Sequence, residues 1–272
     1  SENAFIAGSV NSTIQGAYLG PGGAVIGSSN SSIVNSRGTA IVGGSGNSIA
    51  SGAQYSIVIG GIGNVMGINA SKSIILGGEI NNISGSTEYS GIFAGSGNTI
   101  DTHSNSVIIG GDNNLIHAPL PARQSEGILG GSFNTISGNS SYSTIIGGNL
   151  NLISGAFNSS IIGSTECSIS GVSGGHLSVI IASTQSWVDN TISNANNSTH
   201  ISTQRASIKE NSDYSIIMAN SHGQIIDSSG RCFIIGGHTN PAAKNTIEGV
   251  SANAGIIGAG TSNINFRTRN SL

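Results

Sequence analysis

Pairs of apolar residues recur along this chain, and each pair is followed by two small residues, usually glycines. The clearest copy is SIILGGEINNIS at residues 73–84, where an apolar pair, a glycine pair, an asparagine and an isoleucine follow in turn. The first small residue of the fifteen copies is Ala7, Gly27, Gly43, Gly60, Gly77, Ala94, Gly110, Gly130, Gly147, Gly163, Ala182, Ser202, Ala219, Gly236 or Gly258. Most copies are 16 or 17 residues apart, with wider gaps of about 19–22. The spacing predicts a repeat array.

Other positions in each copy also keep their chemistry. The second residue of the apolar pair is apolar in all fifteen copies, and the first in all but one, where His200 stands. A further apolar residue follows six positions after the first small residue in thirteen copies. Two positions before it, asparagine occurs in nine copies: Asn11, Asn47, Asn64, Asn81, Asn98, Asn114, Asn134, Asn151 and Asn240. Each copy is therefore interpreted as one structural unit of the same design.

The repeat length and residue types favour β-structure. Helical solenoids need units of roughly 33 residues or more, and these copies are half that length. Isoleucine and valine between glycine, asparagine and serine suit short strands joined by tight turns. We therefore expect an all-β, parallel β-solenoid, or β-roll, of about fifteen coils of 16–20 residues. In each coil one strand ends in the apolar pair, the glycines turn a corner, and a second short strand carries Asn-x-Ile, with the asparagines stacked as amide ladders.

The apolar pair predicts how the chain assembles. Adjacent residues of a strand point to opposite faces, so only one of Ile75 and Leu76 can fill the interior of its coil. The other then faces outward, and repetition of the coil produces an apolar stripe. Soluble monomers rarely expose such a stripe, and cyclic self-association would cover it. We expect a bundled or intertwined homotrimer, although the stripe is equally compatible with a dimer.

Coils of the form Ser-x-apolar-apolar-Gly-Gly-x-x-Asn-x-Ile resemble the heads of trimeric autotransporter adhesins and related repeats of phage and large-virus tail fibres. The resemblance extends over roughly residues 1–265. It implies a left-handed parallel β-roll with three chains around one axis, located outside the cell on a virion tail fibre or a bacterial surface. The implied role is attachment to a glycan or protein receptor on the host surface. The coils here are longer than the commoner adhesin-head coil, which leaves the hand of the roll open.

Two other solenoid classes fit the spacing less well. Hexapeptide helices, typical of acyltransferases, need an aliphatic residue at every sixth position, whereas Leu76 and Ile83 are seven apart and Ile92 lies nine further on. Calcium-binding nonapeptide rolls need an aspartate in each turn, and the similar sequence GGSGN at 43–47 offers asparagine instead. Neither a metal nor another cofactor is predicted.

The array divides into three stretches by composition. Residues 1–116 carry seven charged residues and form a regular β-solenoid shaft. Residues 117–265 are predicted to be β-solenoid with longer, decorated loops, and residues 266–272 a C-terminal cap or linker. The sequence HAPLPARQSE at 117–126 contains Pro119 and Pro121, which are expected to break a strand and push out a loop.

The least repetitive sequence lies at residues 185–214 and provides the candidate site. Trp187, the only tryptophan, Asp189, Arg205 and Tyr214 together suit a receptor- or glycan-binding surface, because the indole offers a stacking platform beside polar groups. The alternative interpretation is a degraded pair of coils with solvated loops.

Catalysis is not predicted. The six histidines show no metal-ligand spacing, and glycines repeated fifteen times are corner residues instead of one phosphate-binding loop. Carboxylates at Asp189, Glu210 and Asp213 leave a tailspike-like polysaccharide hydrolase as the alternative from another class. The net charge of −3 offers no footprint for nucleic acid, and no apolar run is long enough to insert in a membrane. The preferred function is a non-catalytic fibre segment for host attachment, with a bacterial adhesin head as its nearest alternative.

The two cysteines test the coil count. Cys167 occupies the asparagine position of its coil, and Cys232 lies four coils later, so they are separated by roughly 19 Å along the solenoid axis. A disulfide requires Cα atoms within about 7 Å. Both thiols are therefore predicted to be free.

Overall fold

The computed structural model describes residues 4–16, 22–123, 125–163, 165–171, 177–182, 191–202, 206–209, 211–219, 223–227, 229–236, 245–249, 252–258 and 261–264. These ranges contain thirty β-strands and no helix that could cross a membrane. The chain divides into two compact units, residues 1–133 and 134–272, and each is described by itself. The predicted C-terminal cap or linker, residues 266–272, lies outside the described residues.

In the first unit the strands alternate between two sheets. Its odd-numbered strands are β1 (Phe5–Ala7), β3 (Ala24–Ile26), β5 (Ala40–Val42), β7 (Ile57–Ile59), β9 (Ile74–Leu76), β11 (Gly91–Phe93), β13 (Val107–Ile109) and β15 (Gly127–Leu129). Its even-numbered strands are β2 (Thr13–Gln15), β4 (Ser32–Val34), β6 (Ser48–Ile49), β8 (Val65–Met66), β10 (Asn82–Ser84), β12 (Thr99–Ser104) and β14 (Leu115–Arg123). We call the two sets the odd sheet and the even sheet.

The second unit repeats this arrangement. Its odd sheet consists of β17 (Thr144–Ile146), β19 (Ser160–Ile162), β21 (Val179–Ala182), β23 (Thr199–Ser202), β25 (Ile216–Ala219), β27 (Phe233–Ile235) and β29 (Gly255–Ile257). Its even sheet consists of β16 (Thr135–Ser137), β18 (Leu152–Ser154), β20 (Ser168–Ser170), β22 (Thr191–Ser193), β24 (Ala206–Lys209), β26 (Gly223–Ile225), β28 (Asn245–Ile247) and β30 (Ser262–Ile264).

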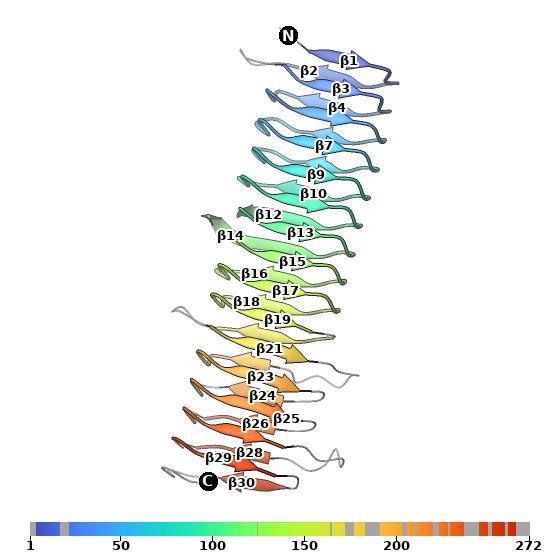
Figure 1. Cartoon of the computed structure of the whole chain (residues 1–272). Helices are drawn as coiled ribbons and strands as arrows, with labels where there is room; N and C mark the ends of the chain where they lie inside the picture. The colour runs from blue at the N-terminus through green and yellow to red at the C-terminus, as the bar shows by residue number, and fades with distance from the viewer. Residues whose placement is uncertain are drawn as a thin grey trace. The chain divides into compact units, whose positions relative to one another are not determined.

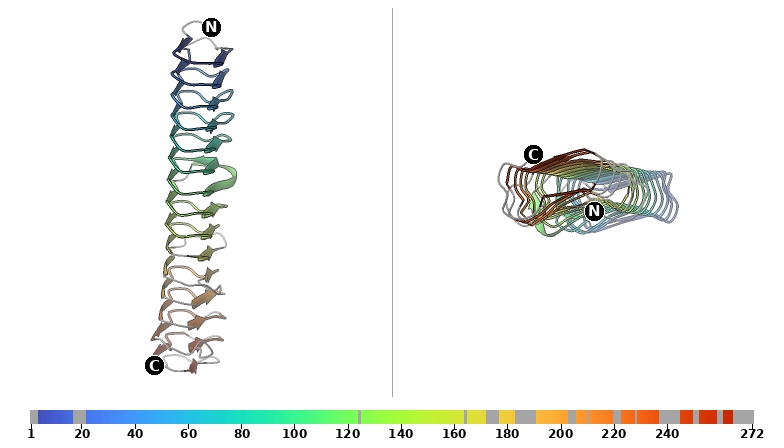
Figure 2. Two further views of the ribbon diagram at one scale, coloured as in Figure 1. Left: turned by 90° about the vertical axis from the view of Figure 1, so that its right-hand side faces the viewer. Right: turned by 90° about the horizontal axis from the view of Figure 1, so that it is seen from below.

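Within each unit every strand pairs in parallel with the strand two places along the chain, so each turn of the chain adds one strand to each sheet (Figure 1). Figure 2 shows the two sheets as opposed walls of stacked strands joined by turns at both edges. Thirty strands at two per coil correspond to fifteen coils. The predicted all-β parallel solenoid is therefore confirmed, with two strands per coil as the repeat pattern indicated.

The core is a pair of isoleucine-rich columns, one from each sheet. In most of the three-residue strands the middle residue points inward: Ile75 of β9 and Ile83 of β10 have no exposed surface. Ile75 pairs in register with Ile92, and Ile83 with Ile100, so like side chains stack on like. Because consecutive strands lie about 4.8 Å apart, each side chain contacts its equivalents in both neighbouring coils. The core is thin but continuous within each unit.

The asparagines form the predicted ladder and add bonds to the backbone. Their side-chain amides bond directly where Nδ2 of Asn114 donates to Oδ1 of Asn98 at 3.1 Å and Nδ2 of Asn151 donates to Oδ1 of Asn134 at 3.0 Å. The side-chain Oδ1 of Asn64 accepts the backbone N–H of Asn81 at 3.0 Å, and Oδ1 of Asn81 accepts that of Asn98 at 3.0 Å. Nδ2 of Asn81 donates to the carbonyl of Gly95 at 3.1 Å. These asparagines are fully buried, so the ladder satisfies backbone groups at a corner where strand pairing ends.

A second ladder, of serines, was not predicted. The Oγ of Ser56 accepts the N–H of Ser73 at 3.1 Å, Ser73 accepts from Ser90 at 3.2 Å, and Ser90 accepts from Ser106 at 3.1 Å. These residues precede each odd strand and are almost wholly buried. The signal was present in the sequence as a serine four positions before the first small residue in nine of the fifteen copies. The serine ladder closes the coil edge opposite the asparagine ladder.

The glycine pair forms the corner as expected. The space available for a side chain differs between its two members. Gly77 and Gly78 have φ of +69° and +79°, in the left-handed region. A Cβ on Gly77 would meet no atom within 4 Å, whereas one on Gly78 would lie 2.3 Å from the carbonyl oxygen of Gly95. This explains why Ala94, with φ of +61°, can replace the first glycine of its coil.

The first coil is one residue out of the predicted register. Ala7 pairs with Ile26, so Gly8, with φ of +58°, is the corner residue that corresponds to Gly27. Asn11 consequently lies at a left-handed turn position with φ of +51° and is exposed, so its assignment to the asparagine ladder was wrong. The error arose because Ile6 was assigned to the second position of the apolar pair and Ala7 to the first small residue of the corner, on residue type alone.

The prolines do not break a strand. β14 runs through both Pro119 and Pro121 to Arg123 and pairs with β12, protruding from the stack of coils in Figure 2. The pairing shifts between Asp101 and His103, where their partners His117 and Ala122 are five residues apart. The insertion is thus absorbed as a bulge within a paired strand, and the prediction of a strand break was wrong.

The prediction that both thiols are free is confirmed, and a histidine is found in the core. Cys167 and Cys232 are both free and buried, and Cys167 takes the asparagine position, where its N–H donates to Oδ1 of Asn151 at 3.0 Å. His200 lies in the odd-sheet core column, in register with Ile180 and Ile217, and is fully buried. Neither ring nitrogen of His200 has a hydrogen-bond partner among the described residues, and burial lowers its pKa from 6.5 to about 4.

We expect Gly77→Ala to lower the free energy of unfolding by about 1–2 kcal/mol, the cost of a left-handed alanine. Gly78→Ala should lose about 1–3 kcal/mol more, because its Cβ must displace backbone of the next coil. Urea denaturation followed by circular dichroism measures the difference. Equal losses in the two variants would contradict this account of the corner.

Stability should fall with acidification through His200. The folded-state pKa is below the unfolded value, so the unfolded chain binds more protons and stability is lost as the pH falls from about 6.5 towards 4. The loss amounts to roughly 3 kcal/mol at the low end. His200→Ile, which matches the neighbouring core residues, should remove this component. Urea midpoints at pH 7.5 and 4.5 compare the two proteins, and parallel pH dependences would refute the assignment.

Candidate binding surfaces

The predicted receptor surface falls mainly outside the described residues. Trp187, Asp189 and Arg205 are all outside them. Tyr214 lies in the turn between β24 and β25 with φ of +57° and 60% of its surface exposed. The neighbouring Asp213 is committed to the turn, since its Oδ1 accepts the N–H of Asn196 at 2.6 Å. Tyr214 is therefore exposed in a turn. That it forms one surface with Trp187, Asp189 and Arg205 stays a prediction.

The outward member of each apolar pair forms an apolar column on the odd sheet of each unit. Twelve of its members are 36–48% exposed: Ile26, Val42, Ile59, Phe93, Ile109 and Leu129 in the first unit, and Ile146, Ile162, Ile181, Ile201, Met218 and Ile235 in the second. Leu76 of β9 is half-buried, and Ile257 of β29 is 74% exposed. The preceding residue in each case points into the core. The prediction that one residue of the pair fills the coil and the other faces outward is confirmed.

The outer face of the even sheet has a different chemistry. Its strands present mainly serine and threonine, as in Thr99 of β12, the two outer residues of β16, and Ser168 and Ser170 of β20. Each unit thus has one apolar and one mainly polar outer wall built on the same isoleucine core. The isoleucine core therefore does not by itself require apolar residues on an outer wall, because the even sheet has the same core and a mainly polar outer face.

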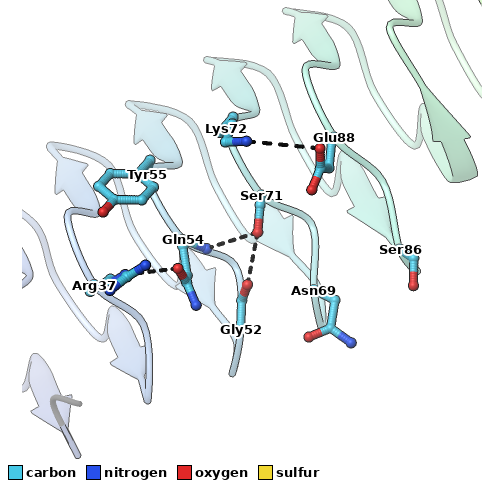
Figure 3. Close-up of a pocket in the computed structure, with 9 residues that line it drawn as sticks. All are labelled: Arg37, Gly52, Gln54, Tyr55, Asn69, Ser71, Lys72, Ser86 and Glu88. Atoms are coloured by element: carbon cyan, nitrogen blue, oxygen red, sulfur yellow. Dashed lines mark hydrogen bonds and ion pairs between the residues drawn. The ribbon is translucent and has the colours of Figure 1, made fainter. Parts of the chain in front are cut away.

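A hollow of about 580 Å³ lies over four successive turns of the first unit, where each even strand leads to the next odd strand (Figure 3). Its lining consists of Arg37, Gly52, Gln54, Tyr55, Asn69, Ser71, Lys72, Ser86 and Glu88. Most of these residues recur at intervals of 17 in the sequence, so that residues 37, 54, 71 and 88 occupy the same place in successive coils. The hollow is therefore produced by stacking of equivalent turns.

Cations and tyrosines are paired at the rim of the hollow. Arg37 lies over the ring of Tyr55, 5.4 Å from its centroid, and its Nε donates to Oε1 of Gln54 at 2.8 Å. Nζ of Lys72 is 2.8 Å from the hydroxyl of Tyr89 and 4.6 Å from its ring centroid. The same Nζ is 3.9 Å from Glu88, in an exposed ion pair. The side chains at the rim are thus held by mutual contacts.

The floor of the hollow is tied together by Ser71. Its hydroxyl donates to the carbonyl of Gly52 at 2.9 Å and accepts the N–H of Gln54 at 3.2 Å. Figure 3 shows these bonds linking the turn of one coil to the turn of the preceding one. The sequence interpretation missed the hollow because it followed the corner glycines, although the 17-residue recurrence of bulky turn residues was visible.

Two histidine–carboxylate pairs lie among the described residues, His103 with Glu126 and His117 with Asp101. Nδ1 of the buried His103 is 2.7 Å from Oε2 of Glu126, which also accepts the hydroxyl of Ser106 at 2.8 Å. The serine bonds to the carboxylate instead of the imidazole, and both ionisable side chains are without exposed surface. The arrangement neither activates a nucleophile nor admits a substrate.

The second pair, His117 and Asp101, lies at the outer face of the even sheet at 3.1 Å. Oδ1 of Asp101 also accepts the hydroxyl of Ser84 at 3.0 Å, so the pair belongs to a chain of surface contacts across three coils. No group of three or more histidine, cysteine, aspartate or glutamate side chains is placed to hold a metal ion within the part of the chain that the structure describes.

Neither family models nor curated proteins give a match to this sequence.

The His103–Glu126 pair should show strong energetic coupling. Glu126 occupies the serine-ladder position, because its carbonyl accepts the N–H of Val107 at 2.9 Å as the other ladder residues do for their coils. Glu126→Ser or His103→Ala alone leaves one partner buried without its bond, at a cost of about 3–5 kcal/mol. The double variant should lose about 0.5–3 kcal/mol less than the sum of the two. Additive losses in urea denaturation would show that the pair is not a stabilising unit.

Proposed function

We propose that this chain is a non-catalytic segment of an extracellular attachment fibre, in which three copies associate along their apolar columns. The observation that carries the proposal is the continuous apolar column on the odd sheet of each unit, opposite a mainly polar wall. Hydrophobic side chains exposed singly need no explanation, but a column repeated coil after coil does. A solenoid bundled in this way is suited to holding binding surfaces away from a virion or a cell.

Self-association is favoured over a foreign partner for a geometric reason. A column repeated at the strand spacing of about 4.8 Å is best matched by another surface of the same spacing, which a second copy supplies. A closed cyclic arrangement buries the column of every copy in the same way. Three copies around one axis would bury the odd-sheet columns and leave the turns and even sheets accessible for attachment.

The described histidine pairs favour binding over catalysis. One is closed off in the core, and the other is part of a surface network with Ser84. Screening the protein against surface polysaccharides tests the competing hydrolase function. Turnover that is abolished by Asp189→Ala or Glu210→Ala would overturn the non-catalytic proposal.

The assembled protein should have a mass of about 81 kDa by light scattering, three times the 27.1 kDa of one chain. Ile109→Asp combined with Ile146→Asp should yield a folded monomer, because a carboxylate buried in the interface without a partner costs several kcal/mol. The matched control is Thr99→Asp with Thr135→Asp on the outer face of the even sheet, which should stay trimeric. A monomeric wild-type protein would disprove the trimer, and equal behaviour of the two double variants would disprove the role of the column.

A further inference from the structure

We infer that the hollow over the turns of the first unit binds an oligosaccharide that carries a carboxylate. The inference rests on the proposed attachment function and names its ligand class. Nine residues from four coils line the hollow, and none of them belongs to the region 185–214 that the sequence favoured. The binding site inferred here therefore lies in the regular part of the array and not in the irregular region that the sequence favoured.

The lining is suited to sugar hydroxyls. Gln54, Asn69, Ser71 and Ser86 can donate and accept hydrogen bonds, and the backbone of Gly52 adds a carbonyl already used by Ser71. The hollow contains no aliphatic side chain, unlike the apolar column, so an apolar ligand or a membrane surface would gain little there. Equivalent positions recur at about 4.8 Å along the coils, which suits an extended chain of polar units.

The charges in the hollow favour an anion. Arg37 and Lys72 contribute two positive charges against the single carboxylate of Glu88, although the whole chain has a net charge of −3. The Nε of Arg37 is held by Gln54 and its guanidinium by the ring of Tyr55. Its two Nη groups have no hydrogen-bond partner among the described residues. A fixed guanidinium with free Nη groups matches the two oxygens of a carboxylate.

Tyr55 in the lining, and Tyr89 outside it but in contact with the lining residue Lys72, supply stacking surfaces. Tyr55 and Tyr89 are 47% and 57% exposed, although rings of this size contribute most to stability when buried. An exposed aromatic ring beside polar groups can cover the C–H face of a sugar and leave its hydroxyls to the floor. Cation contacts on the same rings hold the stacking surfaces in place before the ligand arrives.

Bulky residues at the hollow occupy a left-handed turn position. Tyr55, Lys72 and Tyr89 have φ between +54° and +56°, in the left-handed region that disfavours bulky side chains. Asn105 and Asn158, at the equivalent turns of later coils, are the residue type that tolerates this conformation. A residue held in left-handed conformation without that tolerance costs of order 1 kcal/mol. Tyr142, Tyr214 and Arg231 have φ of +57° to +58° at the equivalent turns of other coils, so the strain belongs to this turn position and is not confined to the hollow.

Calorimetric titration of the full chain with 3′-sialyllactose, tetragalacturonate and lactose tests the site. We expect at least one of the two acidic probes to bind at least tenfold more tightly than lactose. Arg37→Gln should weaken that binding at least tenfold, and Tyr55→Asn at least fivefold. The asparagine suits the left-handed turn and so preserves the fold. Tyr142→Asn is the matched control, because Tyr142 is an exposed tyrosine with φ of +57° at the equivalent turn of another coil.

No binding of either acidic probe, or binding unchanged by both Arg37→Gln and Tyr55→Asn, would overturn the site. An equal loss in Tyr142→Asn would also overturn it. Light scattering and a broad glycan array distinguish failure of the inferred oligosaccharide site from failure of the proposed attachment function. A wild-type protein that assembles and binds other glycans, but neither acidic probe, overturns the site alone. A protein that neither assembles nor binds any glycan overturns the attachment function itself.

Discussion

The fold depends on the hydrogen bonds that lock each coil in register with the next. Strand pairing supplies these bonds along the two walls, but at the edges the chain turns and backbone N–H groups would be left unpaired. The buried side chains of Asn64 and Asn81 at one edge, and of Ser56 and Ser73 at the other, accept those N–H groups from the following coil. Because buried polar groups must be satisfied, the two ladders fix the places of the corners and hence the length of the coil.

With register fixed from within, the outside of the coil is free to take different chemistry on each side. The odd sheet presents an apolar column, the even sheet mainly hydroxyls, and the turns carry charged and aromatic residues. None of these outward residues contributes to the isoleucine core. Assembly and ligand binding can therefore occupy separate surfaces of the same coil, which is the basis of the function proposed for it.

Most of the fold could be predicted from the sequence because one residue type kept each structural place. The isoleucines near Gly77 and Gly78 identified the core, because inward residues alternate along a strand, and the two glycines identified the corner, because a left-handed turn favours glycine. Prediction failed where the marks were ambiguous. Ala7 passed for a corner residue, and Pro119 was expected to end a strand that in fact continues with a bulge. The hollow was missed because Tyr55 and Lys72 occupy a turn position that sequence statistics assign to asparagine or glycine.

The 17-residue spacing of Arg37, Gln54, Ser71 and Glu88 has a consequence for evolution of the surface. These side chains form a line in which each coil contributes a single residue to the same strip of surface. A point mutation in one coil changes one side chain of that strip. Duplication or deletion of a whole coil lengthens or shortens the strip without disturbing the asparagine and serine ladders. Such a surface can change its ligand preference by small steps, which would suit the attachment function that we propose.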